Sequence, residues 1–250
     1  METQQALYQY AVRLGDNSLI MAQRLAEWCS NGPILEEDLA LTNAALDYLG
    51  EAENYYNYAL SLEPDGRTAD DLAYLRNERQ YYNCLLAEQP NGDYAQTMVK
   101  LALFSAYLKL LYDALSQSTD TNLSALASKS LKEVKYHFRH SSEWMIRFGH
   151  GTEESKSRAQ QAIYELWRFT SDMFETTAAD ATLKGIVPDP ASIQSEWNSV
   201  INDLLSRCGL KKPEDPYQVK GGYQAKHTEH LGHILCELQF LQRAYPGAKW

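Results

Sequence analysis

Residues 96–115, QTMVKLALFSAYLKLLYDAL, constrain the fold more than any other segment of the chain. Apart from Lys100 and Lys109, they are apolar on almost every side of a helix. A helix without a polar face has to be enclosed by other helices. The composition favours the same fold class, because 33 Leu and 27 Ala far outnumber 6 Val and 8 Ile, the β-branched residues that suit sheets. The sequence therefore predicts an all-α protein with this helix near its centre.

Clusters of Gly and Pro divide the rest of the chain into segments of helical length. Thr68 and Thr152, each followed by acidic residues, predict helix starts. The irregular connectors are too short to separate a second domain, so we predict one helical domain over residues 1–250 with a C-terminal extension of about 184–250. The expected helices cover residues 3–29, 35–62, 68–88, 93–117, 122–148, 152–179, 191–207 and 225–243.

Charge and cysteine content exclude several classes of function. The net charge of −10 would repel a phosphate backbone, so nucleic acid is not an expected partner. The N-terminus METQQALYQY lacks the pattern of a leader peptide, and no run of about 18 apolar residues predicts a membrane span. The four cysteines lack metal-finger spacing and suit a reducing compartment, so we expect a cytoplasmic protein; they are Cys29, Cys84, Cys208 and Cys236.

Two carboxylates fall on predicted apolar helix faces. Glu78 lies near the middle of the apolar face of 68–88, and Glu53 takes a similar place in 35–62. A carboxylate buried there needs a cation, hydrogen-bond donors or a metal. We expect both to pair with Lys or Arg from another helix. The residues placed with Glu53 are Leu35, Leu39, Leu46, Leu49, Tyr56 and Leu60.

Carboxylates and imidazoles that point into a helical bundle are typical of di-iron proteins, so the histidines decide whether a metal site is present. A di-iron site needs Glu-x-x-His on each of two helices, because this spacing puts both ligands on one face. The residues three places before the six histidines are Val134, His137, Arg147, Gln224, His227 and His230, and none is a carboxylate. The sequence therefore predicts no metal site and no catalytic residue.

Two groups of histidines leave weaker alternatives open. Glu133, His137 and His140 share a stripe of the helix expected over 122–148, and HTEHLGH places three more along part of one helix face. Either group could bind a metal if further ligands arrived, although hydrogen-bonded histidines explain both more simply. The three histidines of HTEHLGH are His227, His230 and His233.

Several segments resemble one known family over the length of the chain. The most specific are LLAEQPNG and HTEHLG. Through them the chain resembles the ferritin-like structural component, known as the C subunit, of bacterial phenylacetyl-CoA epoxidase. The resembling segments are EDLALTNAALDYLGEA, NERQYYNCLLAEQPNGDYA, KEVKYHFRHSSEW, LWRFT and HTEHLGHILCELQFLQRAYPGAKW.

The resemblance implies an all-α ferritin-like bundle with additional C-terminal helices. It also implies a non-catalytic structural subunit without a cofactor of its own, which supports a homologous di-iron catalytic subunit in phenylacetate degradation. That partner would epoxidise the ring of phenylacetyl-CoA with electrons from a separate reductase. By the same resemblance, Glu78-x-x-Tyr81 stands where an ancestor had Glu-x-x-His.

The resemblance also implies substrate contacts near a subunit boundary, at the stretch formed by Gln80, Tyr81, Tyr82 and Asn83. Separately, Lys132, Lys135 and Arg139 share one helix face and could serve docking, although an ordinary solvated face explains them equally well. Two other functions remain open: a di-iron oxygenase in its own right, with ligands such as Glu78, Glu133 and His137, and a free-standing helical scaffold.

Overall fold

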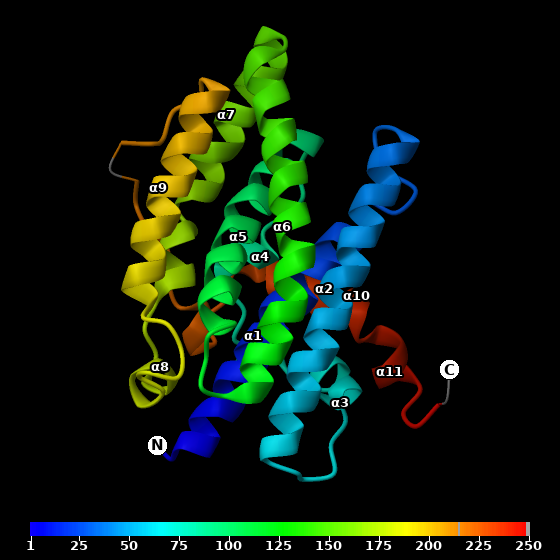
Figure 1. Ribbon diagram of the computed structural model, residues 1–250. Coiled ribbons are helices and arrows are strands. Elements are labelled where there is room, and N and C mark those ends of the chain that lie inside the picture. Colours follow the sequence, from blue (N-terminus) through cyan, green and yellow to red (C-terminus); the bar gives the residue numbers. More distant parts are fainter. Residues whose placement is uncertain (215, 249–250) are drawn as a thin grey trace. The chain divides into compact units, whose positions relative to one another are not determined.

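The computed structural model describes residues 1–214 and 216–248, and the regular elements of these residues are helices joined by turns and irregular segments (Figure 1). Within this part of the chain there is no β-strand, only an isolated bridge between Lys184 and Val187. The predicted all-α fold is confirmed. The helices group into two compact units that are discontinuous in sequence, one made of residues 1–90, 177–183 and 221 onward, and the other of 91–176 and 184–220.

The first unit is built on a hairpin of two long helices, α1 and α2, which lie side by side (Figure 1). Small residues on α2 permit this close approach, and Gly15 of α1 lies against the ring of Tyr56. The elements of this unit are α1 (Thr3–Ala26), α2 (Leu35–Leu62), α3 (Ala69–Tyr74), η1 (Glu78–Gln80), α4 (Leu85–Glu88), α8 (Ala178–Thr182), η3 (Gly222–Gln224), α10 (Glu229–Leu238) and α11 (Phe240–Ala244).

The second unit surrounds α5, the helix predicted to be central. Nearly all of α5 is buried, and even Lys100 has no exposed surface. Trp197 of α9 donates its indole N–H to the Leu103 carbonyl of α5 over 3.0 Å, which satisfies the one polar atom of a buried ring. The elements of this unit are α5 (Tyr94–Leu115), α6 (Thr121–His150), α7 (Glu153–Trp167), η2 (Thr170–Phe174) and α9 (Pro190–Cys208).

One predicted helix is wrong. Residues 68–88 begin as a helix at Thr68, which forms a capping box with Asp71 as expected, but α3 ends at Tyr74. A 3₁₀ turn and an extended stretch follow before α4. Glu78 therefore does not occupy a helix interior; it is exposed on the 3₁₀ turn and needs no compensating cation.

The predicted orientation of α2 is also wrong. Glu53 is exposed, and so are all four leucines placed on its face up to residue 49. Tyr56, placed on the same face, is buried as predicted, and the helix buries the side next to it, on which Ala and Tyr predominate. That face packs more closely against α1, because Ala leaves room for the neighbouring backbone. It comprises Leu41, Ala44, Ala45, Tyr48, Ala52, Tyr55, Tyr56 and Ala59.

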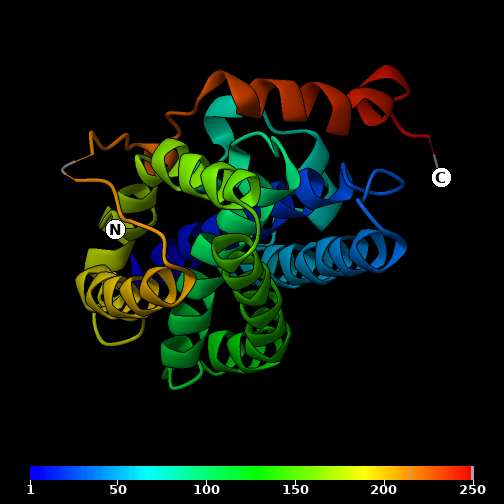
Figure 2. The same cartoon turned by 90° about the horizontal axis from the view of Figure 1, so that it is seen from above.

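Two further predicted helices are shorter than expected. The segment 152–179 begins at its Thr152 cap but ends at Trp167, whose carbonyl accepts a hydrogen bond from the Thr170 hydroxyl. The segment 225–243 begins only at Glu229, which leaves His227 outside α10. Figure 2 shows α10, in orange-red, lying over the segment that contains η1 and α4, with which it is in contact.

Candidate functional site

The stretch predicted to touch substrate, residues 80–83, lies in the first unit; Gln80 ends η1, the chain is extended from Tyr81 onward, and we refer to residues 80–83 as the strap. Gln80 is exposed, and its side chain accepts a hydrogen bond from the backbone N–H of Asn77 over 2.7 Å. Tyr81 and Asn83 are fully buried, whereas Tyr82 is half-buried. The side chains therefore alternate in direction and do not form one surface, as expected of extended backbone.

The cavity beside Tyr82 is small. It has a volume of about 50 Å³ and is also lined by Tyr10, Arg13 and Tyr223. Pockets for small organic ligands usually measure about 300–1,000 Å³. This cavity is too small to enclose an acyl-CoA, so the substrate contact of Gln80, Tyr81, Tyr82 and Asn83 stays a prediction.

Asp16 of α1 holds the beginning of the strap. Its buried carboxylate accepts hydrogen bonds from the Tyr56 hydroxyl over 2.6 Å, from Arg76 Nη1 over 3.1 Å and from the backbone N–H of Tyr82 over 2.8 Å. Arg76 also donates to the carbonyls of Leu72 and Gln80. These bonds replace the helical bonds that residues 76–82 would otherwise make, which explains why the predicted helix breaks here.

The charges around Asp16 keep the neighbouring groups in fixed protonation states. Burial and then the Asp16 charge raise the pKa of Tyr56, so its phenol remains a donor. Burial acts to lower the pKa of Arg76, but Asp16 outweighs it and the pKa is raised. Burial raises the pKa of Tyr81 to about 12, and its hydroxyl donates to the Ala73 carbonyl. None of these groups is poised to exchange a proton near neutral pH.

Glu88 holds the other end of the strap to the C-terminal segment. Its carboxylate accepts from Asn83 Nδ2 over 2.9 Å, from the backbone N–H and hydroxyl of Thr228 over 2.7 and 2.8 Å, and lies 2.9 Å from His227 Nδ1. The other ring nitrogen of His227 is 2.9 Å from the Tyr81 carbonyl. Burial acts to lower the pKa of His227, but Glu88 outweighs it, so the pKa is raised.

The histidines of HTEHLGH do not share one helix face. His227 precedes α10, His230 is half-buried, and His233 is exposed. Burial, followed by the charge of Arg24, lowers the pKa of His230. Only His227 contacts the buried Glu88 cluster, and there it is a partner in an ion pair.

The residues do not fit a di-iron cluster. Glu51 of α2 accepts a hydrogen bond from Ser18, and three places on stands Asn54, which donates to the Gly50 carbonyl. In the other unit, the residue three places after Glu133 is Tyr136, whose ring is exposed. Across residues 1–214 and 216–248, no three His, Cys, Asp or Glu side chains are arranged to hold a metal ion. The ligand set Glu78, Glu133 and His137 does not form.

Helix α5 carries a buried cation, Lys100. The buried ammonium of Lys100 donates to Asn91 Oδ1 over 2.9 Å. A buried ammonium close to a bound cation would be repelled, and carboxylates are the ligands that bridged irons require. The polar interior of each unit is thus occupied by hydrogen bonds and ion pairs of the protein itself.

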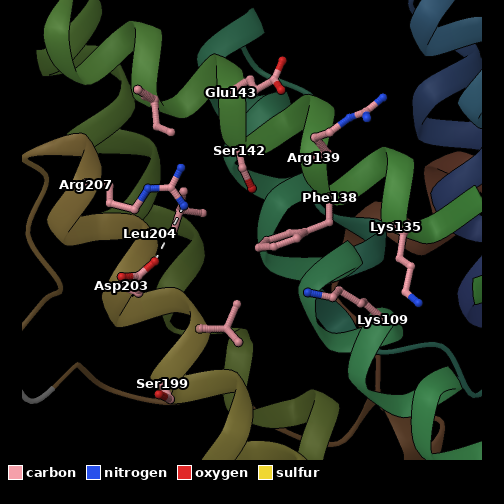
Figure 3. Close-up of a pocket in the computed structure, with 12 residues that line it drawn as sticks. Lys109, Lys135, Phe138, Arg139, Ser142, Glu143, Ser199, Asp203, Leu204 and Arg207 are labelled. Carbon is pink, nitrogen blue, oxygen red and sulfur yellow. Dashed lines mark ion pairs between the residues drawn. The ribbon is translucent and has the colours of Figure 1, made fainter.

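A basic groove in the second unit is the largest concave surface among the pockets described (Figure 3). Its volume is about 890 Å³. Lys109 lies over the ring of Phe138, with its ammonium 5.1 Å from the ring centre, and Arg207 pairs with Asp203 at 3.7 Å. The remaining side chains that line it are Lys135, Arg139, Ser142, Glu143, Ile146, Ser199, Val200 and Leu204.

The side chains that line this groove carry a net positive charge. Lys132, Lys135 and Arg139 are exposed, and the last two line the groove; docking by these residues stays a prediction. Four cations against two carboxylates favour an anionic group in a chain that is otherwise acidic. The excess of positive charge suits the groove to binding an anionic group.

Sequence reasoning missed the two carboxylates that organise the first unit. Asp16 stands in GDNSL within a helix that is otherwise buried on nearly all sides, and Glu88 stands in LLAEQPNG. Asp16 could have been identified from the sequence, because a charged residue within an enclosed helix has to be compensated by buried partners. Arg13 was missed as well; it forms a bidentate ion pair with Asp180 over 2.7 and 2.8 Å.

Comparison with known proteins identifies a family, a relative and a solved structure to which this chain is similar. A model of the family described as phenylacetic acid catabolic protein matches residues 1–250. The C subunit of 1,2-phenylacetyl-CoA epoxidase from Escherichia coli (strain K12) is 43% identical over 243 residues, which cover 96% of this chain and 98% of that protein. Among solved structures, "Protein 19 with aldehyde deformylating oxidase activity from Synechococcus" is similar with a TM-score of 0.61 and 15% identity, covering 84% of this chain and 95% of the other. This likeness confirms the predicted ferritin-like bundle.

Proposed function

Since this chain belongs to the phenylacetic acid catabolic protein family, we propose that it is a non-catalytic structural subunit of a phenylacetyl-CoA epoxidase. The observation that carries this proposal is the content of the helix interiors. Among the described residues, no three His, Cys, Asp or Glu side chains are arranged to hold a metal ion, and buried polar groups pair within the protein, as Glu51 does with Ser18 and Lys100 with Asn91. The fold resembles that of a solved protein with aldehyde deformylating oxidase activity, and the lack of a grouped donor set among the described residues supports a role without a metal of its own.

The chain would act by supporting a homologous partner that carries the di-iron centre. A reductase would supply electrons to that partner, and phenylacetyl-CoA would be its substrate in the degradation of phenylacetate. The high share of each chain covered by the match with the Escherichia coli protein supports a subunit of this kind. The cytoplasm is the expected location of the complex. No helix of the described residues is both long and apolar enough to span a membrane.

The competing function is that of an oxygenase with its own iron, and the ferritin-like fold is the observation that favours it. Both functions are tested by producing the full chain alone, the candidate di-iron subunit alone, and the two together. The measurements are iron content, assembly size and reductase-dependent epoxidation of phenylacetyl-CoA.

We expect iron and epoxidation in the pair, with no stoichiometric iron in this chain alone, because the carboxylates and histidines of its described residues are not grouped to hold a metal ion. Stoichiometric iron in the lone chain, lost in Glu133→Ala, would overturn the proposal in favour of an oxygenase. A free-standing scaffold would instead reveal itself as a chain that carries no iron and forms no complex with the di-iron subunit.

A further inference from the structure

Four exposed leucines lie along one side of α2, in a line that Thr42 interrupts between Leu39 and Leu46. Leu35, Leu39, Leu46 and Leu49 are 71%, 54%, 60% and 39% exposed, and we refer to these four residues as the leucine stripe. Their spacing of four, seven and three residues puts them on one side of the helix, over a length of about 21 Å at 1.5 Å per residue. Single exposed leucines are ordinary on protein surfaces, but four of them along one side of a helix indicate a contact surface.

The packing of the first unit does not account for this line. Helix α2 already buries its Ala- and Tyr-rich face in the hairpin with α1. The leucine stripe is therefore a second apolar face of one helix. A helix that is apolar on two faces needs two neighbours to remove both from water.

Gly50 adds an independent observation beside the stripe. A glycine inside a helix is unfavourable relative to alanine, so it usually marks a place where something approaches the backbone closely. A Cβ at Gly50 would meet no atom within 4 Å, in contrast to Gly15 of α1, whose Cβ would lie 2.5 Å from the Tyr56 ring. The chain itself gives Gly50 no packing reason, and a close approach by another molecule would supply one.

Charge identifies the kind of neighbour. Helix α2 contains no Lys or Arg, and Glu36 and Glu53 are exposed at the two ends of the leucine stripe. In a symmetric contact between two copies, like charges would face one another across the axis or lie close to it. Helices that lie on membrane surfaces carry Lys and Arg along their polar face, which α2 lacks. The complementary surface is an apolar helix face flanked by cations.

We infer that the leucine stripe is the apolar centre of the contact with the homologous di-iron subunit, which would present an apolar helix face bordered by Lys or Arg. This inference rests on the proposed function, and it adds the surface through which that function is exerted. Glu36 and Glu53 would form the polar rim, and Gly50 would admit the partner's helix to the α2 backbone. Interfaces of stable complexes have this arrangement of apolar centre and polar rim.

The inference is tested in the full chain with the di-iron subunit as the binding partner. Leu39→Glu and Leu46→Glu each place a charge within the proposed apolar centre, and we expect each to weaken the complex at least about tenfold. Leu75→Glu is the matched control, because Leu75 is as exposed as Leu39, at 54%, but lies outside α2. Affinity is measured by titration, and circular dichroism melts of each free variant verify that it is folded.

The outcomes separate the inference from the proposed function. Selective loss of binding in Leu39→Glu and Leu46→Glu supports the inference. If the wild-type pair forms but both variants bind as tightly as the Leu75→Glu control, the contact lies elsewhere and the inference is wrong while the proposed function stands. If the lone chain dimerises and Leu46→Glu abolishes the dimer, the leucine stripe pairs two copies and its assignment to a different partner is overturned.

Gly50→Ala supplies a test that loss of folding cannot imitate. The added methyl group favours the helix and meets no atom of the free chain, so the free variant should melt at a higher temperature than wild type. In the complex the same methyl group would block close approach, and we expect binding to weaken several-fold. A variant that is more stable and binds equally well would contradict the role given to Gly50.

Discussion

At the scale of single residues, Asp16 decides the course of the chain from α3 to α4. Its carboxylate is fully buried and is bonded to Tyr56, to Arg76 and to the backbone of Tyr82. A buried charge destabilises the folded protein unless its partners compensate it. Removing one partner therefore lowers the free energy of unfolding by more than the intact pair contributes to it. Asp16 therefore determines the local structure through the hydrogen bonds that it accepts from these three residues.

Replacement of Asp16 by Asn should destabilise the protein strongly. The change leaves the buried Arg76 guanidinium without its anion, and we expect a loss of about 3–5 kcal/mol in the free energy of unfolding measured with urea. Asp65→Asn is the control, since the Asp65–Arg67 pair is exposed by 45% and 41%, so solvent screens it and its loss should change the stability little. Equal effects of the two substitutions would show that Asp16 has no special structural role.

His227 makes stability depend on pH. Glu88 raises the pKa of His227 in the folded protein above the reference value of 6.5, so the folded state binds this proton more tightly than the unfolded state. The resulting stabilisation is complete below pH 6.5 and is lost as pH rises through the folded-state pKa. We expect the stability difference between wild type and His227→Gln to be larger at pH 6 than at pH 9, as measured by urea unfolding. A difference that grows with pH would contradict the assigned ion pair.

At the scale of elements, the α1–α2 hairpin depends on close approach of two backbones. Gly15 has no room for a side chain, because its Cβ would lie 2.5 Å from Tyr56 Cε1. The side chain of Tyr56 cannot move away without losing its hydrogen bond to Asp16. The close packing of the hairpin and the hydrogen bonds of Asp16 therefore depend on the same position of the Tyr56 side chain.

Gly15→Ala should be destabilising although alanine is the better helix former. Overpacking against Tyr56 is expected to cost about 1–3 kcal/mol, more than the gain of about 1 kcal/mol in helix propensity. In the free chain, Gly50→Ala provides the matched change without a neighbour and should be stabilising by about 1 kcal/mol. Thermal melts of both variants test whether the two changes in melting temperature have opposite signs. Stabilisation by Gly15→Ala would show that the hairpin can accommodate a methyl group beside Tyr56.

At the scale of the whole molecule, each of the two units is built from segments that are separated in the sequence, so the chain passes between the units several times. The polypeptide passes from one unit to the other after residues 90, 176, 183 and 220. Residues 184–250, predicted as a C-terminal extension, are divided between the units. Their last part supplies His227, Thr228 and Gln239 to the strap of residues 80–83 and its neighbours.

A chain that ends at Lys220 should therefore fail to fold cooperatively. It would retain Glu88 as a buried carboxylate without His227 and Thr228, and it would expose the apolar surface that α10 covers. A chain that ends at Pro246 keeps these contacts and should unfold as the full chain does. Calorimetry distinguishes the two; a sharp transition of normal size in the shorter chain would mean that the C-terminal segment is dispensable for the first unit.

The sequence by itself determined the fold class, the central position of α5 and the absence of Glu-x-x-His pairs, because helical periodicity, Leu and Ala content and ligand spacing are local properties of a chain. Most long helices were predicted correctly for the same reason. The tertiary structure alone decided which of the two apolar faces of α2 is buried and where the helix predicted over 68–88 breaks. Both outcomes depend on residues distant in sequence: α1 selects the Ala-rich face because it permits closer packing, and Asp16 attracts Arg76 and the Tyr82 backbone because its buried charge has to be satisfied.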